Sequence, residues 1–423
     1  SLASQPLKEV DNYKRLKEGF VHPSGTALPK VYWWFLNGNI DTSEAKKELR
    51  EMKKAGIAGF DFFEIGVPKG DTMIEAGPAF LSEGSLKVIE CIVREAGALD
   101  LEMGLNLASS WNAGGAWTLP ENAGKSLYFS KTTIQGQKGK QKIQVPFPEI
   151  SFPQNALIGG SGKPLVPLRA NGRPVYYEDV AVLAIPLDVN GILDTSGVYD
   201  VTRFFDKKNE VLNWKAPPGN WQILRYVCSN SGQQIVLPSP HSAGLTIDHF
   251  DSTAVRTHLM HIINSLIPVI GDFRKSALKS FYLASYEARG FVWTPTLPNV
   301  FKELNGYDIY KFLPSLYNKE LFDSSVTAKV ETDFKKTLSE LMINNLYKVA
   351  KRICNSYGLK INSEAGGPGY PLYNGPAEPL KALGALDIPR GEFWVNHSRH
   401  YLDRTGKDSI DILRVVKEVS AAS

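Results

Sequence analysis

The stretch from residue 31 to residue 64, VYWWFLNGNIDTSEAKKELREMKKAGIAGFDFFE, decides the fold class of this chain. Its first five residues are apolar and β-prone and predict a buried strand. Residues 43–54 have helical spacing and predict a helix, with Thr42 or Ser43 as its N-cap. Residues 59–64 are again apolar and predict a second strand. A strand, a helix and a strand in this order predict two parallel neighbours in one sheet.

The same alternation of strands and helices returns along most of the chain. Further predicted strands lie at residues 101–107, 280–287, 359–364 and 390–396, and further helices at residues 85–99, 251–270, 324–358 and 409–420. This series predicts the α/β class and a (β/α)8 TIM-barrel-like fold. Because only six strands precede the end at Ser423, within a helical pattern, we expect the barrel to be incomplete in this chain. An open α/β sheet of six strands is the alternative.

Residues 130–242 interrupt this series with an all-β pattern. Short alternating runs, separated by turn-rich pieces, lie at residues 142–145, 180–185, 198–205 and 221–228. Several strands without helices predict an inserted, antiparallel β-sandwich-like domain. The chain is therefore expected to divide into residues 1–129 with barrel strands one to three, residues 130–242 as the insertion, and residues 243–423 with strands four to six.

The composition excludes several functional classes. Of the 423 residues, 43% are hydrophobic and 22% are charged, which allows a large core and excludes a disordered or fibrous chain. The 48 basic and 44 acidic residues nearly cancel, so no nucleic-acid partner is expected. The three cysteines are far apart and outside CxxC spacing, which argues against a disulfide framework and a zinc site. No segment has the roughly 18 consecutive apolar residues of a membrane helix.

Polar and aromatic residues follow the predicted strands, at the edge where barrels carry their active sites. They are Asn37 and Asn39 after the first strand, Glu64 in the second, Asn106, Trp111 and Trp117 at and after the third, Glu287 in the fourth, Glu364 in the fifth, and Glu392 with Trp394 in the sixth. Amides and acids bond sugar hydroxyls, and indole faces cover the apolar C–H patches of a sugar ring. The set predicts a carbohydrate site at the mouth of the barrel.

Some of these residues also have a purely structural interpretation. Glu64 follows two phenylalanines and suits a helix cap or an ion pair. Glu392 can pair with Arg390, two residues earlier. Trp33 and Trp34 lie within a strand, and a core position is the better interpretation of both.

The other two acids are stronger candidates for chemistry. Glu287 and Glu364 end apolar strands, where a carboxylate is costly unless it is hydrogen-bonded or used. His258 and His261 share one helix face, but without a nearby acidic ligand motif they suit the surface or the core better than a metal site. The sequence contains no GxSxG nucleophile elbow, no P-loop and no GxGxxG before a helix. Serine hydrolases and nucleotide-binding or NAD-binding proteins are therefore not favoured.

A series of short segments, in order along most of the chain, carries a resemblance to a known family. The segments are YWWFLNGNI at 32–40, MKKAGIAGF at 52–60, SWNAGGAWTLPENA at 110–123, SYE at 285–287, WT at 293–294, NGYD at 305–308, FLP at 312–314 and GEFW at 391–394. Together they resemble glycoside hydrolase family 106. The resemblance implies an inverting, calcium-dependent α-L-rhamnosidase on a (β/α)8 barrel with attached or inserted β-domains.

The resemblance also implies roles for individual residues. Glu287 matches the position of the general acid and Glu392 that of the general base, so their carboxyl groups should stand roughly 6.5 to 9.5 Å apart. Glu364 resembles a carboxylate near the calcium ion and the substrate hydroxyls, and is the candidate metal ligand. The residues expected to line the sugar pocket are Asn37, Asn39, Asn106, Trp111, Trp117 and Trp394. The implied partner is a rhamnose-containing oligo- or polysaccharide, and the implied location is periplasmic or extracellular.

The chain departs from the family pattern at one position near the site. Family members often carry an acid three residues before the fourth-strand glutamate, and here that residue is Ala284. Members also run well beyond the C-terminus of this sequence. These departures keep a second function open, a non-catalytic carbohydrate-binding protein on a degenerate barrel.

Overall fold

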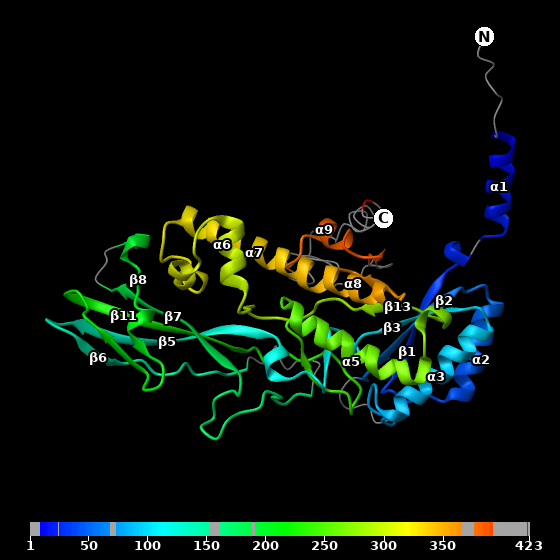
Figure 1. Ribbon diagram of the computed structural model, residues 1–423, viewed down its shortest axis with the longest axis horizontal. Coiled ribbons are helices and arrows are strands. Elements are labelled where there is room, and N and C mark those ends of the chain that lie inside the picture. The colour runs from blue at the N-terminus through cyan, green and yellow to red at the C-terminus, as the bar shows by residue number, and fades with distance from the viewer. Residues whose placement is uncertain are drawn as a thin grey trace, which may run out of the picture.

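The protein is described by a computed structural model that covers residues 9–23, 25–67, 73–152, 161–187, 191–365, 376–391 and 421. The molecule is elongated, with a parallel sheet and its helices at one end and antiparallel strands at the other (Figure 1). Helix α1 (Glu9–Val21) extends away from the end that carries the parallel sheet. No helix in these ranges is long and apolar enough to cross a membrane.

Six parallel strands form the larger sheet, in the order in which the chain reaches them. They are β1 (Lys30–Leu36), β2 (Gly59–Ile65), β3 (Glu102–Asn106), β13 (Leu278–Leu283), β14 (Lys360–Ser363) and β15 (Ile388–Pro389). Each neighbouring pair is parallel, which confirms the predicted mixed α/β class.

Two predicted strands have different bounds. The predicted strand at 280–287 stops at Leu283, so Glu287 lies four residues beyond its end. The sixth strand pairs at residues 388–389, before the predicted range of 390–396, most of which lies outside the described residues, as does the predicted helix at 409–420.

Helices cover one face of the parallel sheet. Their bounds are α2 (Thr42–Lys54), α3 (Glu83–Ala98), α5 (Ser252–Ile270) and α8 (Lys348–Ser356), and each packs against the next in this order. Helix α2 begins one residue before the predicted range, because the Asp41 carboxylate accepts the amides of Ser43 and Glu44. Asp41 is thus the N-cap, and the prediction of Thr42 or Ser43 is wrong by one or two positions.

Side-chain contacts show that the sheet is strongly curved. Strands β1 and β14 are four places apart in the sheet, or about 19 Å if it were flat. Nevertheless the Tyr32 hydroxyl on β1 lies 2.9 Å from Oε1 of Glu364, just after β14. Arg390, next to β15, reaches Asp61 on β2 in the same way, at 2.6 Å. The inner face therefore folds toward itself like a barrel wall, although no pairing joins β1 to β15 in the described ranges, and a closed barrel stays a prediction.

Two antiparallel sheets separate β3 from β13 in the chain. One holds β5 (Lys125–Gly136), β11 (Gly219–Asn230), β7 (Tyr177–Pro186) and β8 (Tyr199–Asp200), and the other holds β6 (Gln141–Gln144), β10 (Val211–Trp214) and β9 (Phe205–Asp206). One apolar cluster, including Val182, Leu212 and Ile223, draws residues from both sheets. The described parts of residues 130–242 contain no helix longer than three residues. The first strand of this region starts at Lys125, and the domain limits of 130 and 242 stay a prediction.

The remaining elements connect these parts. They are β4 (Gly114–Gly115), paired with β12 (Leu245–Thr246), helices α6 (Leu297–Asn305), α7 (Ser324–Met342) and α9 (Pro379–Leu383), a π-helical turn (Ile343–Tyr347), and 3-10 turns at Gly25–Ala27, Pro120–Asn122, Thr195–Gly197, Thr202–Phe204, Phe273–Lys275 and Tyr310–Leu316. The single helix predicted over 324–358 is therefore α7 and α8 joined by the π turn. We call residues 125–230 the insertion, and we call the inner face of the parallel sheet together with its carboxyl end the mouth.

Candidate active site

Glu364 is the centre of a hydrogen-bonded group on the inner face of the sheet. Its Oε1 accepts the hydroxyls of Tyr32, at 2.9 Å, and Tyr282, at 2.7 Å. Its Oε2 accepts the hydroxyl of Ser285. Burial, followed by the charge of Glu364, raises the pKa of both tyrosines well above the usual value, so both phenols stay protonated. Strands β1 and β13, and the loop directly after β13, thus aim hydroxyl donors at one carboxyl group that follows β14.

Arg390 extends this group to a fourth and a fifth strand. Its guanidinium donates to Asp61 and lies over the rings of Tyr32, at 5.1 Å, and Tyr282, at 4.7 Å. A Cβ at Gly104 would lie 2.0 Å from Oδ1 of Asp61, so only glycine fits beside this carboxylate. These side chains form the mouth network, which consists of Tyr32, Asp61, Tyr282, Glu364 and Arg390.

An aromatic corner lies next to the mouth network. The Trp34 and Trp111 rings meet at 89° with centroids 5.8 Å apart, and Phe63 packs 5.2 Å from Trp111. Trp33, on the other face of β1, is buried against the helices as predicted. Trp34 is 50% exposed, so the core interpretation is wrong for this residue. Strand side chains alternate between faces, and Trp34 shares the inner face with Tyr32.

Glu287 lies beyond β13, beside the loop that follows β3. Its main-chain N–H donates to Oδ1 of Asn112 at 2.6 Å, and its side chain is partly buried. The preceding residue, Tyr286, is buried and packs edge-on against His249 at 4.9 Å. Glu392 and Trp394 lie outside the described residues, so the predicted carboxyl separation stays a prediction.

Comparison with known proteins identifies the family to which this chain belongs. The model of glycoside hydrolase family 106, described as alpha-L-rhamnosidase, matches residues 21–195 and 187–411. The chain belongs to this family.

Two relatives show how much of a longer protein this chain corresponds to. It is 26% identical, over 398 residues, to a protein of Formosa agariphila named "Putative beta-glucuronidase", covering 91% of this chain and 33% of that protein. The solved structure of a rhamnosidase from Novosphingobium sp. PP1Y superposes with a TM-score of 0.68 and 19% identity, covering 88% of this chain and 49% of that one. The chain thus spans about a third and a half of these two proteins, and the second likeness supports the fold.

The asparagines after β1 in this family 106 member differ in their surroundings. Asn37 is buried, and its side chain is used by two main-chain partners, the amide of Val67 and the carbonyl of Ile74. It holds the loop after β2 in place. Asn39 is exposed at the start of the loop. Only Asn39 therefore has its side chain open to solvent at this point.

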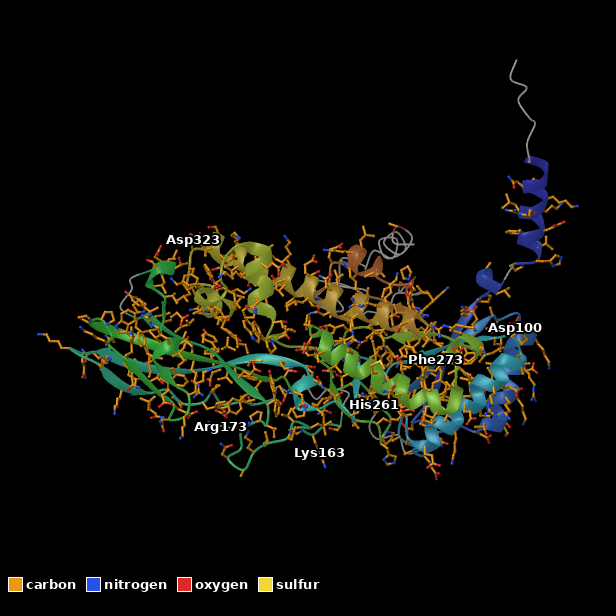
Figure 2. The ribbon with its side chains drawn as sticks, viewed as in Figure 1. Asp100, Lys163, Arg173, His261, Phe273 and Asp323 are labelled. Atoms are coloured by element: carbon orange, nitrogen blue, oxygen red, sulfur yellow. The ribbon has the colours of Figure 1, made fainter. Side chains whose placement is uncertain are left out.

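Trp117 lies apart from the aromatic corner. Its indole N–H donates to Nδ1 of His258 at 3.1 Å, and its ring stacks on His261 at 4.5 Å. Both histidines are on α5, where Figure 2 labels His261. Burial lowers the pKa of His258 to about 3, which keeps the ring neutral as an acceptor. The structure thus brings Trp111, but not Trp117, to the other inner-face aromatic rings.

Two further side-chain amides on the inner face have an unused hydrogen-bond acceptor. Asn106 donates to the carbonyls of Ala108 and Ser110, but its buried Oδ1 has no partner in the described part of the chain. Oδ1 of Asn362 is buried as well, and it too has no partner within the described ranges. Both residues pair in register with Tyr282, one on each side. Unpaired buried acceptors beside the mouth network suit donors supplied by a ligand or by water.

Glu64 has a structural environment. It is buried on the helix-facing side of β2 and accepts the hydroxyls of Ser109, at 2.6 Å, and Ser242, at 3.1 Å. Burial raises its pKa, although the serine hydrogen bonds oppose the shift. It joins the loop after β3 to the segment that returns from the insertion.

The described residues around Glu364 do not fit a calcium ion. Calcium takes six to eight oxygen ligands. Within the described ranges, no three His, Cys, Asp or Glu side chains gather at one point. The groups that contact Glu364 are the hydroxyls of Tyr32, Tyr282 and Ser285, and no second carboxylate is among them in the described residues. We therefore assign no step to calcium, and the calcium dependence implied by the family stays a prediction.

Sequence reasoning missed most of the mouth network. Tyr32, Tyr282, Asp61 and Arg390 were not singled out as site residues, and Arg390 bonds Asp61 across the sheet. One usable signal was the alternation in β1, where every second residue shares a face. The other partners come from strands far apart in the sequence, and only the curvature of the sheet joins them.

Proposed function

We propose that this chain carries the active site of a glycoside hydrolase that acts as an inverting α-L-rhamnosidase on rhamnose-containing glycans. Family membership and one structural observation support it. The observation is that Glu364, with three hydroxyl donors, and the Glu287 loop follow the carboxyl ends of the neighbouring strands β14 and β13, and that an aromatic corner lies on the same inner face. Enzymes on parallel barrels carry their catalytic residues at this end.

The proposed chemistry needs two carboxyl groups on opposite sides of the sugar. Glu287 donates a proton to the departing glycosidic oxygen, and Glu392 removes a proton from the attacking water. Glu364 has acceptor capacity beyond its three hydroxyl donors, because a carboxylate offers about four acceptor positions. It accepts a sugar hydroxyl and orients the ring.

The side chains of the site favour a 6-deoxy sugar over a uronic acid. The methyl group of rhamnose is apolar and suits the corner between Trp34 and Trp111. The carboxylate of a glucuronide would instead require a cation, and Arg390 is already paired with Asp61. This argument favours the activity described for the family over the name of the Formosa agariphila relative.

The test is hydrolysis by the full-length polypeptide. Aryl α-L-rhamnoside and aryl β-D-glucuronide are compared with and without a chelator, and NMR identifies the anomer released. We expect turnover of the rhamnoside with inversion. Preference for the glucuronide, or release of the retained anomer, would contradict the proposal.

Ala284 supports a second candidate, a non-catalytic carbohydrate-binding protein. This buried residue lies on the inner face where many family members carry an acid. Rhamnose binding in calorimetry without turnover of either substrate would favour this candidate.

We also propose a periplasmic or extracellular location, which is supported by the family alone. Fractionation of the producing cells tests it. Recovery of the protein in the cytoplasmic fraction would contradict it.

A further inference from the structure

Asn112 combines three unusual features beside Glu287. Its backbone is in the left-handed region, with φ of 66°. Ser110, two residues earlier, also has a positive φ, of 87°. The Asn112 side chain is 2% exposed. Its Oδ1 accepts the main-chain N–H of Glu287, so its Nδ2 is the remaining donor, and this buried group has no hydrogen-bond acceptor among the residues that the structure describes.

The chain on both sides of Asn112 is fixed. The carbonyl of Trp111 accepts the amide of Val236, at 3.1 Å, and the carbonyl of Ala113 accepts that of Ile247, at 3.0 Å. The amide of Ala113 donates to Nε2 of His249, whose pKa burial lowers to about 4. The asparagine therefore meets Glu287 from a rigid support.

Glu287, in contrast, lies in a segment without regular structure. Residues 284–292 form no helix and no strand. Its main-chain N–H is held by a side chain from another loop, rather than by a neighbouring strand. The direction of the Glu287 side chain depends on this main-chain position.

The choice of asparagine has a chemical reason. An aspartate would accept the same N–H, tolerate the same backbone and leave no donor unpaired. It would, however, place a negative charge beside Glu287 and strengthen proton binding there. The titratable groups that line the pocket beside Tyr286 and Ala288, the two neighbours of Glu287 in the chain, are Lys125, Asp248, His249, Tyr286 and Arg289. Glu364 lies on the other side, where it accepts the hydroxyl of Ser285. An uncharged acceptor positions the acid without changing its proton affinity.

We propose that Asn112 is a positioning residue for the general acid, which it holds through the main chain of Glu287 without adding charge. The inference rests on the proposed function for the role of Glu287, but the contact itself can be tested without activity. Backbone strain and an unpaired buried donor gather at functional positions because packing alone does not require them.

Two variants separate positioning from charge. Asn112→Gly removes the side chain and suits the left-handed backbone, so it should fold. Asn112→Asp keeps the acceptor and adds a charge. Asp100→Gly is the matched control, since Asp100 is exposed at φ of 51°, and Figure 2 shows it at the outer end of the molecule.

Hydrogen exchange and pH profiles in the full-length polypeptide provide the readouts. In Asn112→Gly we expect amide exchange at Glu287 to rise about tenfold or more. We also expect kcat for an aryl rhamnoside to fall about tenfold or more, with KM nearly unchanged. In Asn112→Asp, exchange should stay protected while the alkaline limb of the kcat/KM profile moves up by about half a pH unit or more. Asp100→Gly should match the wild type in all three readouts.

Unchanged exchange at Glu287 in Asn112→Gly would overturn the inference, whatever the activity. Equal pH profiles in Asn112→Asp and the wild type would overturn the charge argument. A wild type that hydrolyses no rhamnoside would contradict the proposed function alone, because the exchange experiment still decides whether Asn112 holds Glu287.

Discussion

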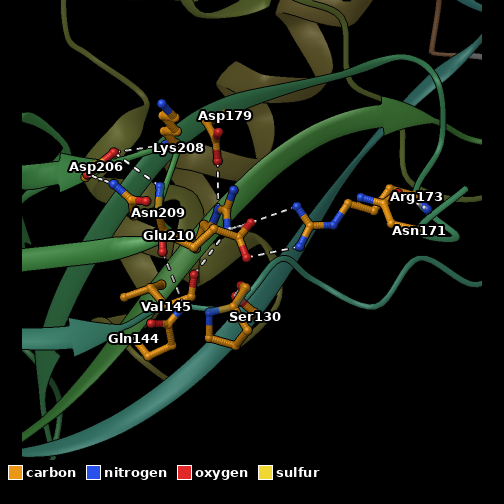
Figure 3. Close-up of polar contacts among 12 residues, drawn as sticks. Ser130, Gln144, Val145, Asn171, Arg173, Asp179, Asp206, Lys208, Asn209 and Glu210 are labelled. Carbon is orange, nitrogen blue, oxygen red and sulfur yellow. Dashed lines mark hydrogen bonds and ion pairs between the residues drawn. The ribbon is translucent and has the colours of Figure 1, made fainter. Parts of the chain in front are cut away.

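The insertion and the mouth each bury a polar network, and the two networks are completed differently. In the insertion, Arg225 is 1% exposed and donates to Asp179 and Glu210, each at 2.8 Å. Arg173 contacts the same Glu210 through two nitrogens, at 2.9 and 3.0 Å, as Figure 3 shows. Both carboxylates in this network have guanidinium partners, and the carbonyl of Val145 accepts a further Arg225 hydrogen.

The mouth is less complete. Among the described residues, buried polar atoms of Asn106, Asn112 and Asn362, close to the mouth network, have no hydrogen-bond partner, whereas in the insertion only Asn230, at its last residue, has such an atom. Tyr32 is 44% exposed although its hydroxyl contacts Glu364. A network with all partners present supports the fold, whereas unused donors and acceptors next to a network give that part of the protein capacity for a ligand. We therefore expect the network in the insertion to stabilise the fold and the mouth to bind a ligand.

The largest expected effect is on stability, in the insertion. Arg225→Met leaves Asp179 and Glu210 without their shared partner and should lower the free energy of unfolding by about 3–5 kcal/mol. Denaturant titration measures it, and kcat/KM per folded molecule should stay constant. If Arg225→Met lowers rhamnoside turnover and leaves the free energy of unfolding unchanged, the assignment of this network to stability is wrong.

The mouth should show the opposite behaviour. Glu364→Gln replaces one acceptor oxygen by an amide that cannot accept the Ser285 hydroxyl. We expect kcat/KM to fall about 100-fold, with little change in the denaturation midpoint. Loss of stability comparable to that of Arg225→Met, with activity kept, would make the mouth network structural as well.

Trp33 and Trp34, neighbours in β1 on opposite faces of the sheet, allow the same comparison within one strand. Trp34→Ala should raise KM for an aryl rhamnoside about tenfold, because it removes half of the aromatic corner. Trp33→Ala should instead cost about 3–5 kcal/mol of stability, because Trp33 is buried among the helices. Steady-state kinetics and urea unfolding measure the two effects, and equal behaviour of both variants would contradict the assignment of faces.

A further expected effect is on the pH dependence of stability. Burial lowers the pKa of His249 to about 4 and that of His258 to about 3. Both are neutral in the folded protein and protonate in the unfolded chain below about pH 6.5, so the free energy of unfolding should fall as the pH drops below this value. The slope approaches about 1.4 kcal/mol per pH unit for each histidine.

Urea unfolding between pH 7 and pH 5 measures this slope. The double variant His249→Gln, His258→Gln is the control, and its slope should be clearly flatter. An unchanged slope would show that the two rings do not carry the effect.

Local pattern predicted the first part of the fold well. The strands at β1, β2 and β3 and helices α2 and α3 lie within two residues of their predicted bounds, because each combines a regular apolar period with a stop or cap. The ends of β13 and β15 were placed wrongly, since the apolar run at 280–286 continues beyond the last paired residue.

The site was harder to predict because residue type does not determine a partner. Asn37 and Trp117 are residue types that often bind sugars. The side chain of Asn37, however, is hydrogen-bonded to a main-chain carbonyl and a main-chain amide of a nearby loop, and the indole of Trp117 is hydrogen-bonded to a histidine on α5. In β1, both faces are apolar or aromatic, so the sequence could not show that Trp34 is exposed. The sequence gives no reason to select Asn112, because its role depends on a contact with Glu287, 175 residues away.

The most direct test of the account is a leaving-group series with Glu287→Gln in the full-length polypeptide. Substrates are aryl and alkyl α-L-rhamnosides whose leaving groups span a wide range of acidity. A general acid matters most for poor leaving groups, so the variant should lose about 100-fold or more on alkyl rhamnosides and far less on the most acidic aryl ones. Equal losses across the series, or near-normal turnover of alkyl rhamnosides, would contradict the role of Glu287 and the proposed active site.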